Sequence, residues 1–203
     1  MFAYIKGNLE VKTNGYVVID VNGIGYKIFM SETAINKLGQ IGEIVKIHTY
    51  VRVREDDISI FGFNTNEELR MFELLLSVSG IGAKSALVIL SNVSVSSFAL
   101  AIINNDVNLL KKLPGIGPKT AQRVILELKD KLKKENEIVA NEDREVSDTI
   151  KAAIIDDEKI AEATAALKVL GYTGKEIEKA LEKVDANLSV EDIIRKGLLN
   201  LAR

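Results

Sequence analysis

The first 63 residues carry the hydrophobic pattern of short β-strands. Runs rich in valine, isoleucine, tyrosine and phenylalanine fall at residues 16–21, 25–30, 43–53 and 58–63. Glycine, asparagine and aspartate separate these runs, and such residues favour turns. Short strands at this spacing predict a small barrel, closed or half-closed.

After Asn64 the pattern changes to the period of an α-helix. Thr65 and Glu68 have the spacing of a capping box, in which each side chain caps a backbone amide of the first turn. Apolar residues then recur at helical spacing, at Leu69, Phe72, Leu75 and Leu76. Several short helices are predicted from here to about residue 134, the last of them over about 118–133.

Beyond this helical region the sequence predicts a linker and then a small bundle. Residues 135–156 are acidic, lack aromatic side chains and have weak periodicity, so we interpret them as the linker. Residues 157–203 predict three short helices. The first ends at Gly171, a typical C-terminal cap, and the second begins with a capping box at Thr173. So small a bundle on a linker is more often an interaction module than an enzyme.

The tripeptide Gly-Ile-Gly occurs three times, each time with a lysine two residues later. The stretches are NGIGYK (22–27), SGIGAK (79–84) and PGIGPK (114–119). The first stands between two strand-forming runs, and Asn-Gly is the strongest signal for a type I′ hairpin turn. It is therefore predicted to be a β-hairpin and nothing more.

The second and third stretches belong to a duplicated unit. Residues 73–90 and 109–128, aligned on their glycines, are offset by 35 residues. Each consists of a helix, a Gly-Ile-Gly turn and a second helix. A single copy could be a glycine turn that only packs, but two matched copies favour one functional unit used twice.

The predicted chemistry of this unit is phosphate binding. Two glycines leave the backbone of the turn unshielded, while the isoleucine between them can anchor the turn in the core. The following amides point outward at a helix N-terminus, where free N–H groups and the helix dipole favour an anion. Lysines and hydroxyl side chains lie nearby, although they could also be ordinary solvated residues. The residues predicted to form the two phosphate-binding turns are Ser79, Gly80, Gly82, Ala83, Lys84, Ser85, Gly115, Gly117, Lys119, Thr120 and Arg123.

Several other functions are excluded by the sequence. A nucleotide-binding P-loop needs glycine directly before its lysine, but Ala83 and Pro118 occupy that place, so ATP binding by this chain is not expected. The chain has no cysteine and a single histidine, His48, which argues against iron–sulfur clusters and histidine-based zinc sites. No catalytic residue, metal site or cofactor is predicted. No apolar run reaches membrane-spanning length and no signal peptide is visible, so no membrane association and a cytoplasmic location are expected.

Charge is distributed unevenly along the chain. The formal net charge of the whole is −2, which does not by itself suggest nucleic acid. Residues 1–62 are neutral, residues 63–135 carry +3 and residues 136–203 carry −5. The only basic segment is therefore the one that holds both predicted phosphate-binding turns.

These motifs, in this order, resemble the RuvA family of bacterial Holliday-junction-binding proteins. SGIGAK and PGIGPK are similar to helix-hairpin-helix motifs, the preceding barrel carries VREDD (53–57), and the C-terminal bundle carries ALKVLGY. The resemblance implies a multi-domain β plus α protein: an N-terminal OB-like β-barrel, a central all-α domain with two helix-hairpin-helix motifs, a flexible linker and a C-terminal three-helix bundle. The domain limits are predicted at 1–63, 64–134, 135–156 and 157–203.

The resemblance also implies the function and the partners. RuvA-like proteins bind four-way DNA junctions as a homotetramer, recruit the hexameric ATPase RuvB, and can work with the junction resolvase RuvC. The sequence leaves open whether one tetramer or two bind the junction. The family's acidic pin corresponds to Glu55 and Asp56, with Asp57 as a neighbouring acid. The motor-binding candidates are Leu170, Gly171 and Tyr172.

Two other functions remain open on the sequence. LPGIGPKTA is also similar to the hairpin of helix-hairpin-helix DNA glycosylases, in which the lysine at the place of Lys119 can be the nucleophile. Those enzymes need an aspartate about eighteen residues later, and here Glu137 occupies that place. The acidic C-terminal bundle alone would also suit a protein-binding scaffold.

Overall fold

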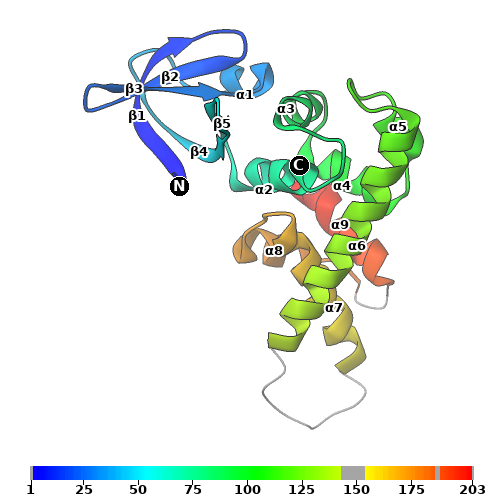
Figure 1. Cartoon of the computed structure of the whole chain (residues 1–203). Helices are drawn as coiled ribbons and strands as arrows, with labels where there is room; N and C mark the ends of the chain where they lie inside the picture. The colour runs from blue at the N-terminus through cyan, green and yellow to red at the C-terminus, as the bar shows by residue number, and fades with distance from the viewer. Residues whose placement is uncertain (1, 143–153, 186–187, 203) are drawn as a thin grey trace. The chain divides into compact units, whose positions relative to one another are not determined.

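The computed structural model of the chain describes residues 2–142, 154–185 and 188–202, and is shown in Figure 1. It divides into two compact units. The first consists of Met1–Leu76 and Ile81–Val93, and the second of Ser77–Gly80 and Ser94–Arg203. Within the described residues, no single helix is long and apolar enough to cross a membrane.

The first unit contains a closed five-stranded barrel, so the predicted barrel is confirmed. Its strand order is β1-β2-β3-β5-β4, with β3 and β5 parallel and every other pair antiparallel. The strands are β1 (Tyr4–Lys12), β2 (Tyr16–Val21), β3 (Ile24–Phe29), β4 (Ile44–Val53) and β5 (Ile58–Phe63). Strand β1 was not predicted. The β2–β3 turn has positive φ at both Asn22 (54°) and Gly23 (86°), as the predicted hairpin requires.

A short helix, α1 (Glu32–Asn36), also escaped prediction. Ser31 caps it by accepting a hydrogen bond from the amide of Ala34. Ala34 and Ile35 join the barrel core, so the helix closes one end of the barrel with apolar side chains.

The helices α2 (Asn66–Leu76) and α3 (Ala83–Asn92) complete the first unit. The ring of Phe72 on α2 lies 4.8 Å from that of Phe63 and 5.5 Å from that of Phe61, measured between centroids. All three rings are buried. Thr65 caps the amide of Glu68 as predicted, but the Glu68 carboxylate bonds the amide of Asn64.

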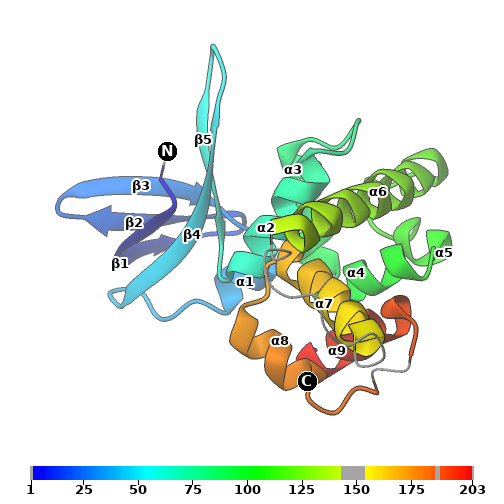
Figure 2. The same cartoon turned by 90° about the horizontal axis from the view of Figure 1, so that it is seen from below.

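The hairpin formed by β4 and β5 projects beyond the rest of the barrel, as Figure 2 shows. Strand β1 pairs with β4 only as far as His48, and β3 pairs with β5 only at Ile60 and Phe61. Beyond Val51 and Ile60 the two strands of the hairpin therefore pair only with each other.

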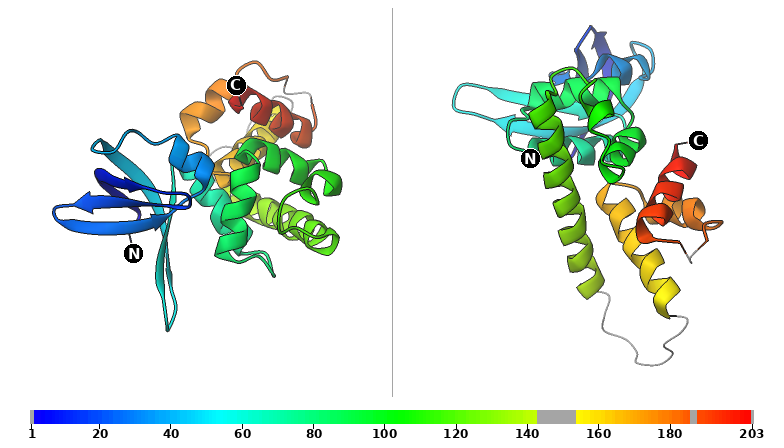
Figure 3. Two further views of the ribbon diagram at one scale, coloured as in Figure 1. Left: turned by 90° about the horizontal axis from the view of Figure 1, so that it is seen from above. Right: turned by 90° about the vertical axis from the view of Figure 1, so that its right-hand side faces the viewer.

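The second unit is helical. It contains α4 (Val95–Ile103), α5 (Val107–Leu110), α6 (Pro118–Glu142), and the three-helix bundle α7 (Ile154–Val169), α8 (Gly174–Leu181) and α9 (Val190–Leu201). Figure 3 shows α6 and α7 side by side. The bundle's predicted caps are confirmed: Gly171 has φ 99° after α7, and Thr173 and Glu176 form a capping box before α8.

Helix α6 extends past the predicted start of the linker. It continues to Glu142, through eight residues assigned to the linker, and α7 begins at Ile154 rather than at 157. Three of these eight residues are Glu, which has high helix propensity and needs no apolar face, so periodicity did not reveal the extension. Residues 143–153, the remainder of the predicted linker, lie outside the described residues.

Candidate nucleic-acid interface

The two predicted phosphate-binding turns have matching backbone geometry. The first glycine of each has positive φ, 92° at Gly80 and 83° at Gly115, a conformation that glycine adopts without strain. The isoleucines that follow, Ile81 and Ile116, are buried, as expected. The carbonyl of the second glycine then accepts the first helical hydrogen bond, from Ala86 at 2.9 Å in one copy and from Ala121 at 2.8 Å in the other.

Both turns leave helix N-termini open to an anion. Gly82 is the N-cap of α3 and makes no side-chain capping bond. Apart from the adjoining backbone, a Cβ atom placed on Gly82 or on Gly117 would meet no atom within 4 Å. In α6 the first position is Pro118, which has no N–H. The amides available to an anion are therefore those of Lys119 and Thr120. At both helix N-termini the free amides are therefore not covered by side chains, and such N-termini can bind phosphate.

The predicted side-chain contacts around these turns differ in exposure. Lys84 and Lys119 are exposed, and neither forms an ion pair among the residues that the structure describes. The hydroxyl-bearing Ser85 and Thr120 are half-buried. Ala83 is buried, so only its backbone could reach DNA.

Arg123 has a different setting from the two lysines. Its Nη1 donates to the carbonyl of Ser79 at 3.1 Å, and its Nε lies 4.0 Å from the Glu127 carboxylate. Glu127 in turn accepts from the amide of Ser79 at 3.3 Å. One turn further along α6, Lys131 donates to the carbonyl of Ser77 at 3.4 Å. One face of α6 therefore holds the backbone that leads into the SGIGAK turn.

The predicted acidic pin lies at the tip of the β4–β5 hairpin. The amide of Arg54 donates to the carbonyl of Asp57 at 2.8 Å, which closes the turn. Glu55 and Asp56 are exposed, and no ion pair involves them within the described part of the chain. Asp57 differs, because its carboxylate bonds Ser59 and Arg52. These bonds hold the pKa of Asp57 below its ordinary value, and the bond from Ser59 has the larger effect.

The predicted motor-binding residues lie mostly inside the second unit. Leu170 is 1% exposed and Gly171 is buried, so Leu170 offers no side-chain surface to a partner in this structure. Tyr172 is half-buried, and its hydroxyl is hydrogen-bonded to Ser96 at 2.8 Å. These residues keep only a predicted role in partner binding.

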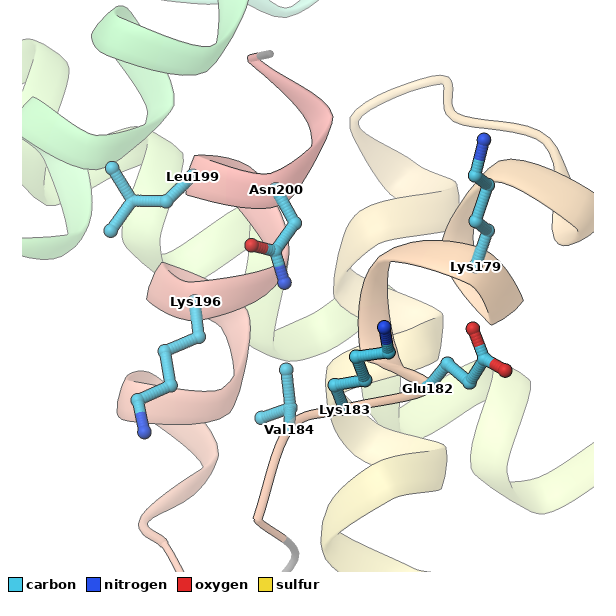
Figure 4. Close-up of a pocket in the computed structure, with 7 residues that line it drawn as sticks. All are labelled: Lys179, Glu182, Lys183, Val184, Lys196, Leu199 and Asn200. Carbon is cyan, nitrogen blue, oxygen red and sulfur yellow. The ribbon is translucent and has the colours of Figure 1, made fainter.

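Sequence reasoning missed a surface feature of the bundle. A pocket of about 440 Å³ opens between α8 and α9 and is shown in Figure 4. Leu199, 51% exposed, lies at its edge, and the other lining residues are Lys179, Glu182, Lys183, Val184, Lys196 and Asn200. Leu199 lies beside the buried residues of α9, which are Ile193, Ile194, Gly197 and Leu198, and is not one of them.

A barrel followed by two helix-hairpin-helix turns defines a class of protein that contacts the sugar–phosphate backbone of DNA. Three family models match the chain: "RuvA N terminal domain" at residues 1–62, "SAM-like Helix-hairpin-helix tandem" at 72–130, and "RuvA, C-terminal domain" at 158–202. The chain belongs to the RuvA family.

Similar proteins cover the chain from end to end. A protein of Acetivibrio thermocellus is 50% identical over 204 residues, covering 100% of both chains. A protein of Clostridium perfringens (strain ATCC 13124) is 46% identical over 203 residues, again covering 100% of both. A third, from Ruminiclostridium cellulolyticum, is 44% identical over 207 residues, covering 99% of this chain and 100% of its own. Each is named "Holliday junction branch migration complex subunit RuvA". These matches speak against the glycosylase alternative.

Proposed function

We propose that this protein binds four-way DNA junctions as a homotetramer, without regard to base sequence, and recruits a RuvB-type ATPase motor that drives branch migration in recombination and repair. The observation that carries the proposal is the duplicated Gly-Ile-Gly turn, whose two copies present open helix N-termini in matching geometry. Contacts of this kind bind phosphate and position a protein on DNA, but they do not distinguish one base sequence from another. The names of the similar proteins support the same function.

The shape of the ligand supports the proposed tetramer. A junction with unstacked arms has nearly fourfold symmetry, and a fourfold assembly offers each arm an identical pair of turns. The two exposed acids at the hairpin tip, Glu55 and Asp56, would then gather four times near the symmetry axis and repel phosphates. This repulsion weakens binding in general but favours a ligand whose strands separate at its centre.

The decisive experiment is a gel-shift comparison of a synthetic four-way junction, a linear duplex and a single strand, at two salt concentrations. A strong preference for the junction, independent of its sequence and weakened by salt, is expected, because counterions compete for phosphate contacts. Equal binding to junction and duplex would contradict the junction-specific function and leave only generic phosphate binding.

The protein itself is proposed to be non-catalytic, with ATP hydrolysis supplied by the motor. A borohydride trapping assay on a damaged-base duplex tests this against a lyase that uses Lys119: a trapped covalent adduct would contradict the proposal. The cytoplasmic location, the participation of RuvC and the choice between tetramer and octamer stay predictions.

Motor recruitment is assigned to the C-terminal bundle. Removal of residues 157–203 should preserve junction binding and abolish stimulation of the motor. Because the predicted contact Leu170 is buried, the exposed Leu199 beside the pocket is a better site for a surface variant. Leu199→Asp should weaken stimulation of the motor with junction affinity unchanged, whereas Lys175→Ala, on exposed α8 surface, should change neither.

A further inference from the structure

The tip of the β4–β5 hairpin has little support from the barrel. Beyond the pair Val51–Ile60 the two strands pair only with each other. One outer cross-strand pair, Val53 with Ile58, is exposed at 70% and 69%. A two-stranded hairpin is at best marginally stable in water, so the turn that carries Glu55 and Asp56 needs another source of order.

A polar cluster of Arg52, Ser59 and Asp57 joins the two strands near this turn. Arg52 and Ser59 are directly opposite each other on the two strands. The Arg52 Nη2 atom lies 3.0 Å from Asp57 Oδ2 and 3.2 Å from Ser59 Oγ. The Ser59 hydroxyl also donates to the same carboxylate oxygen. The three side chains therefore form a closed triangle that spans both strands and the last residue of the turn.

The triangle is anchored in the barrel at its base. Ser59 is 5% exposed, and the Arg52 side chain is 23% exposed. The guanidinium carbon of Arg52 lies 5.4 Å from the ring centroid of Phe61, which is buried, a distance suited to a cation–π contact. Asp57 is thus tied through Arg52 to the barrel core, whereas Glu55 and Asp56 have no comparable ties among the described residues.

We propose that Asp57 is a positioning residue of the acidic pin: with Arg52 and Ser59 it fixes the turn, so that Glu55 and Asp56 alone present free negative charge at its tip. Three consecutive acids then have two different roles. The charge of Asp57 is offset by Arg52 and its carboxylate is turned back toward the strands. The role in junction selection rests on the proposed function, but the ordering of the turn does not.

The charges around Asp57 agree with this division. The hydrogen bond from Ser59 and then that from Arg52 lower the pKa of Asp57, and the positive charges of Arg52 and Arg54 add to their effect. The neighbouring acids on the turn are Glu55 and Asp56. The triangle should therefore remain intact throughout the neutral pH range.

The ordering of the turn can be measured without DNA. The chain has no cysteine, so Glu55→Cys gives a single site for a nitroxide spin label in the full-length protein. The label should be immobilised when the triangle is intact, and its spectrum should sharpen when Ser59→Ala or Asp57→Ala is added. Ser59→Thr, which keeps the hydroxyl, should restore the immobile spectrum. An unchanged spectrum in both disrupting variants would overturn the proposal.

Junction selection is tested with variants matched in charge. Asp57→Ala adds one positive unit to the pin, and Arg52→Gln removes one, so the double variant Asp57→Ala/Arg52→Gln has the native net charge but no triangle. The ratio of duplex Kd to junction Kd should fall by roughly two- to tenfold in Asp57→Ala, in Ser59→Ala and in the double variant, a fall on the scale of about one net hydrogen bond. Each single variant breaks two bonds of the triangle, and the double variant breaks all three. Arg54→Gln, a charge change outside the triangle, controls for charge alone.

The outcomes separate the possible roles of Asp57. A native ratio in the double variant would mean that Asp57 acts only through its charge, and the positioning role would be rejected. If the spin label responds as expected but the native protein does not prefer junctions, the proposed function fails while the ordering of the turn stands. Thermal unfolding of each variant identifies any that lose the barrel as a whole.

Discussion

The Nη1 atom of Arg123 donates a hydrogen bond to the backbone carbonyl of Ser79, over 3.1 Å and across 44 residues of sequence. Arg123 belongs to the helix that follows the second Gly-Ile-Gly turn, and Ser79 immediately precedes Gly80 of the first. Arg123, which is predicted to contact DNA, thus links the first turn to the helix that follows the second turn. The two copies of the duplicated motif are therefore joined by a hydrogen bond as well as by the chain between them.

The first prediction concerns Arg123. Arg123→Ala should weaken junction binding by about fivefold, as for the loss of about 1 kcal/mol from one hydrogen bond, because the SGIGAK turn is held less firmly. The salt dependence should not change, since no phosphate contact is lost. Binding titrations at several salt concentrations measure both quantities. A salt slope lower by about one would instead identify Arg123 as a direct phosphate contact.

Lys119 should behave in the opposite way. Its side chain is exposed at the start of α6 and has no ion-pair partner within the described residues. Lys119→Ala should weaken binding uniformly across junction sequences and lower the salt slope by about one, because one phosphate contact is removed. Lys175→Ala removes the same charge from the C-terminal bundle and should leave the slope unchanged. Equal slopes in the two variants would count against the contact.

The two glycines of PGIGPK allow a test that separates folding from binding. Gly115 has φ 83°, where a Cβ is strained, so Gly115→Ala should lower the free energy of unfolding by about 1–2 kcal/mol. Gly117 has no such strain and open space around it, so Gly117→Ala should fold normally. Its added methyl group would shield the amides that follow, and junction affinity should fall.

Thermal unfolding and gel shifts on the same two proteins give both answers. A Gly117→Ala variant that binds as tightly as the native protein would show that phosphate does not approach this backbone.

Local geometry of this kind could be predicted from sequence, and long-range geometry could not. The turn glycines, the buried isoleucines and the helix caps follow from neighbouring residues, and they are found as expected. Strand β1 was missed because its inward positions, Ile5 and Leu9, are few and a register shift between Leu9 and Val11 interrupts the alternation.

The contacts of the site that depend on tertiary structure had no sequence signal. The bond between Arg123 and Ser79 requires that α6 lie along the first turn, and no periodicity within either segment reports this. The pairing of Arg52 with Asp57 needs the strand register that places Arg52 opposite Ser59. The family resemblance assigned the pin to Glu55 and Asp56 and left Asp57 as a neighbouring acid, but only the structure shows that Asp57 is bonded to Arg52 and Ser59.

The capping box of α8 gives a prediction in acid. Hydrogen bonds from the Thr173 hydroxyl at 2.6 Å and from its amide at 2.8 Å hold the pKa of Glu176 below its ordinary value of 4.5. A carboxylate with a lowered pKa stabilises the folded state above its ordinary pKa, and this contribution is lost as pH falls through the lowered value. Glu176→Gln should therefore be less stable than the native protein at pH 7, and the difference should shrink below about pH 4.5.

Circular dichroism melts from pH 7 to pH 3 measure this difference. Glu178→Gln, an exposed carboxylate on the same helix, is the matched control and should melt like the native protein at every pH. A difference between Glu176→Gln and the native protein that persists undiminished at pH 3 would contradict the role of the ionised cap.

The acidic pin should lower affinity and raise selectivity at the same time. Neutralising its two free charges in Glu55→Gln/Asp56→Asn should strengthen binding to both junction and linear duplex, because in the proposed tetramer four pairs of carboxylates no longer repel the phosphates. The gain should be larger for the duplex, whose continuous strands would otherwise cross the charged centre, so the preference for junctions should fall. The effect should diminish at high salt, where exposed charges are screened.

The double variant Glu10→Gln/Glu178→Gln removes the same charge from surfaces outside the pin and should preserve the preference. If both double variants strengthen binding equally, net charge rather than the position of Glu55 and Asp56 sets the affinity, and the pin has no selective role.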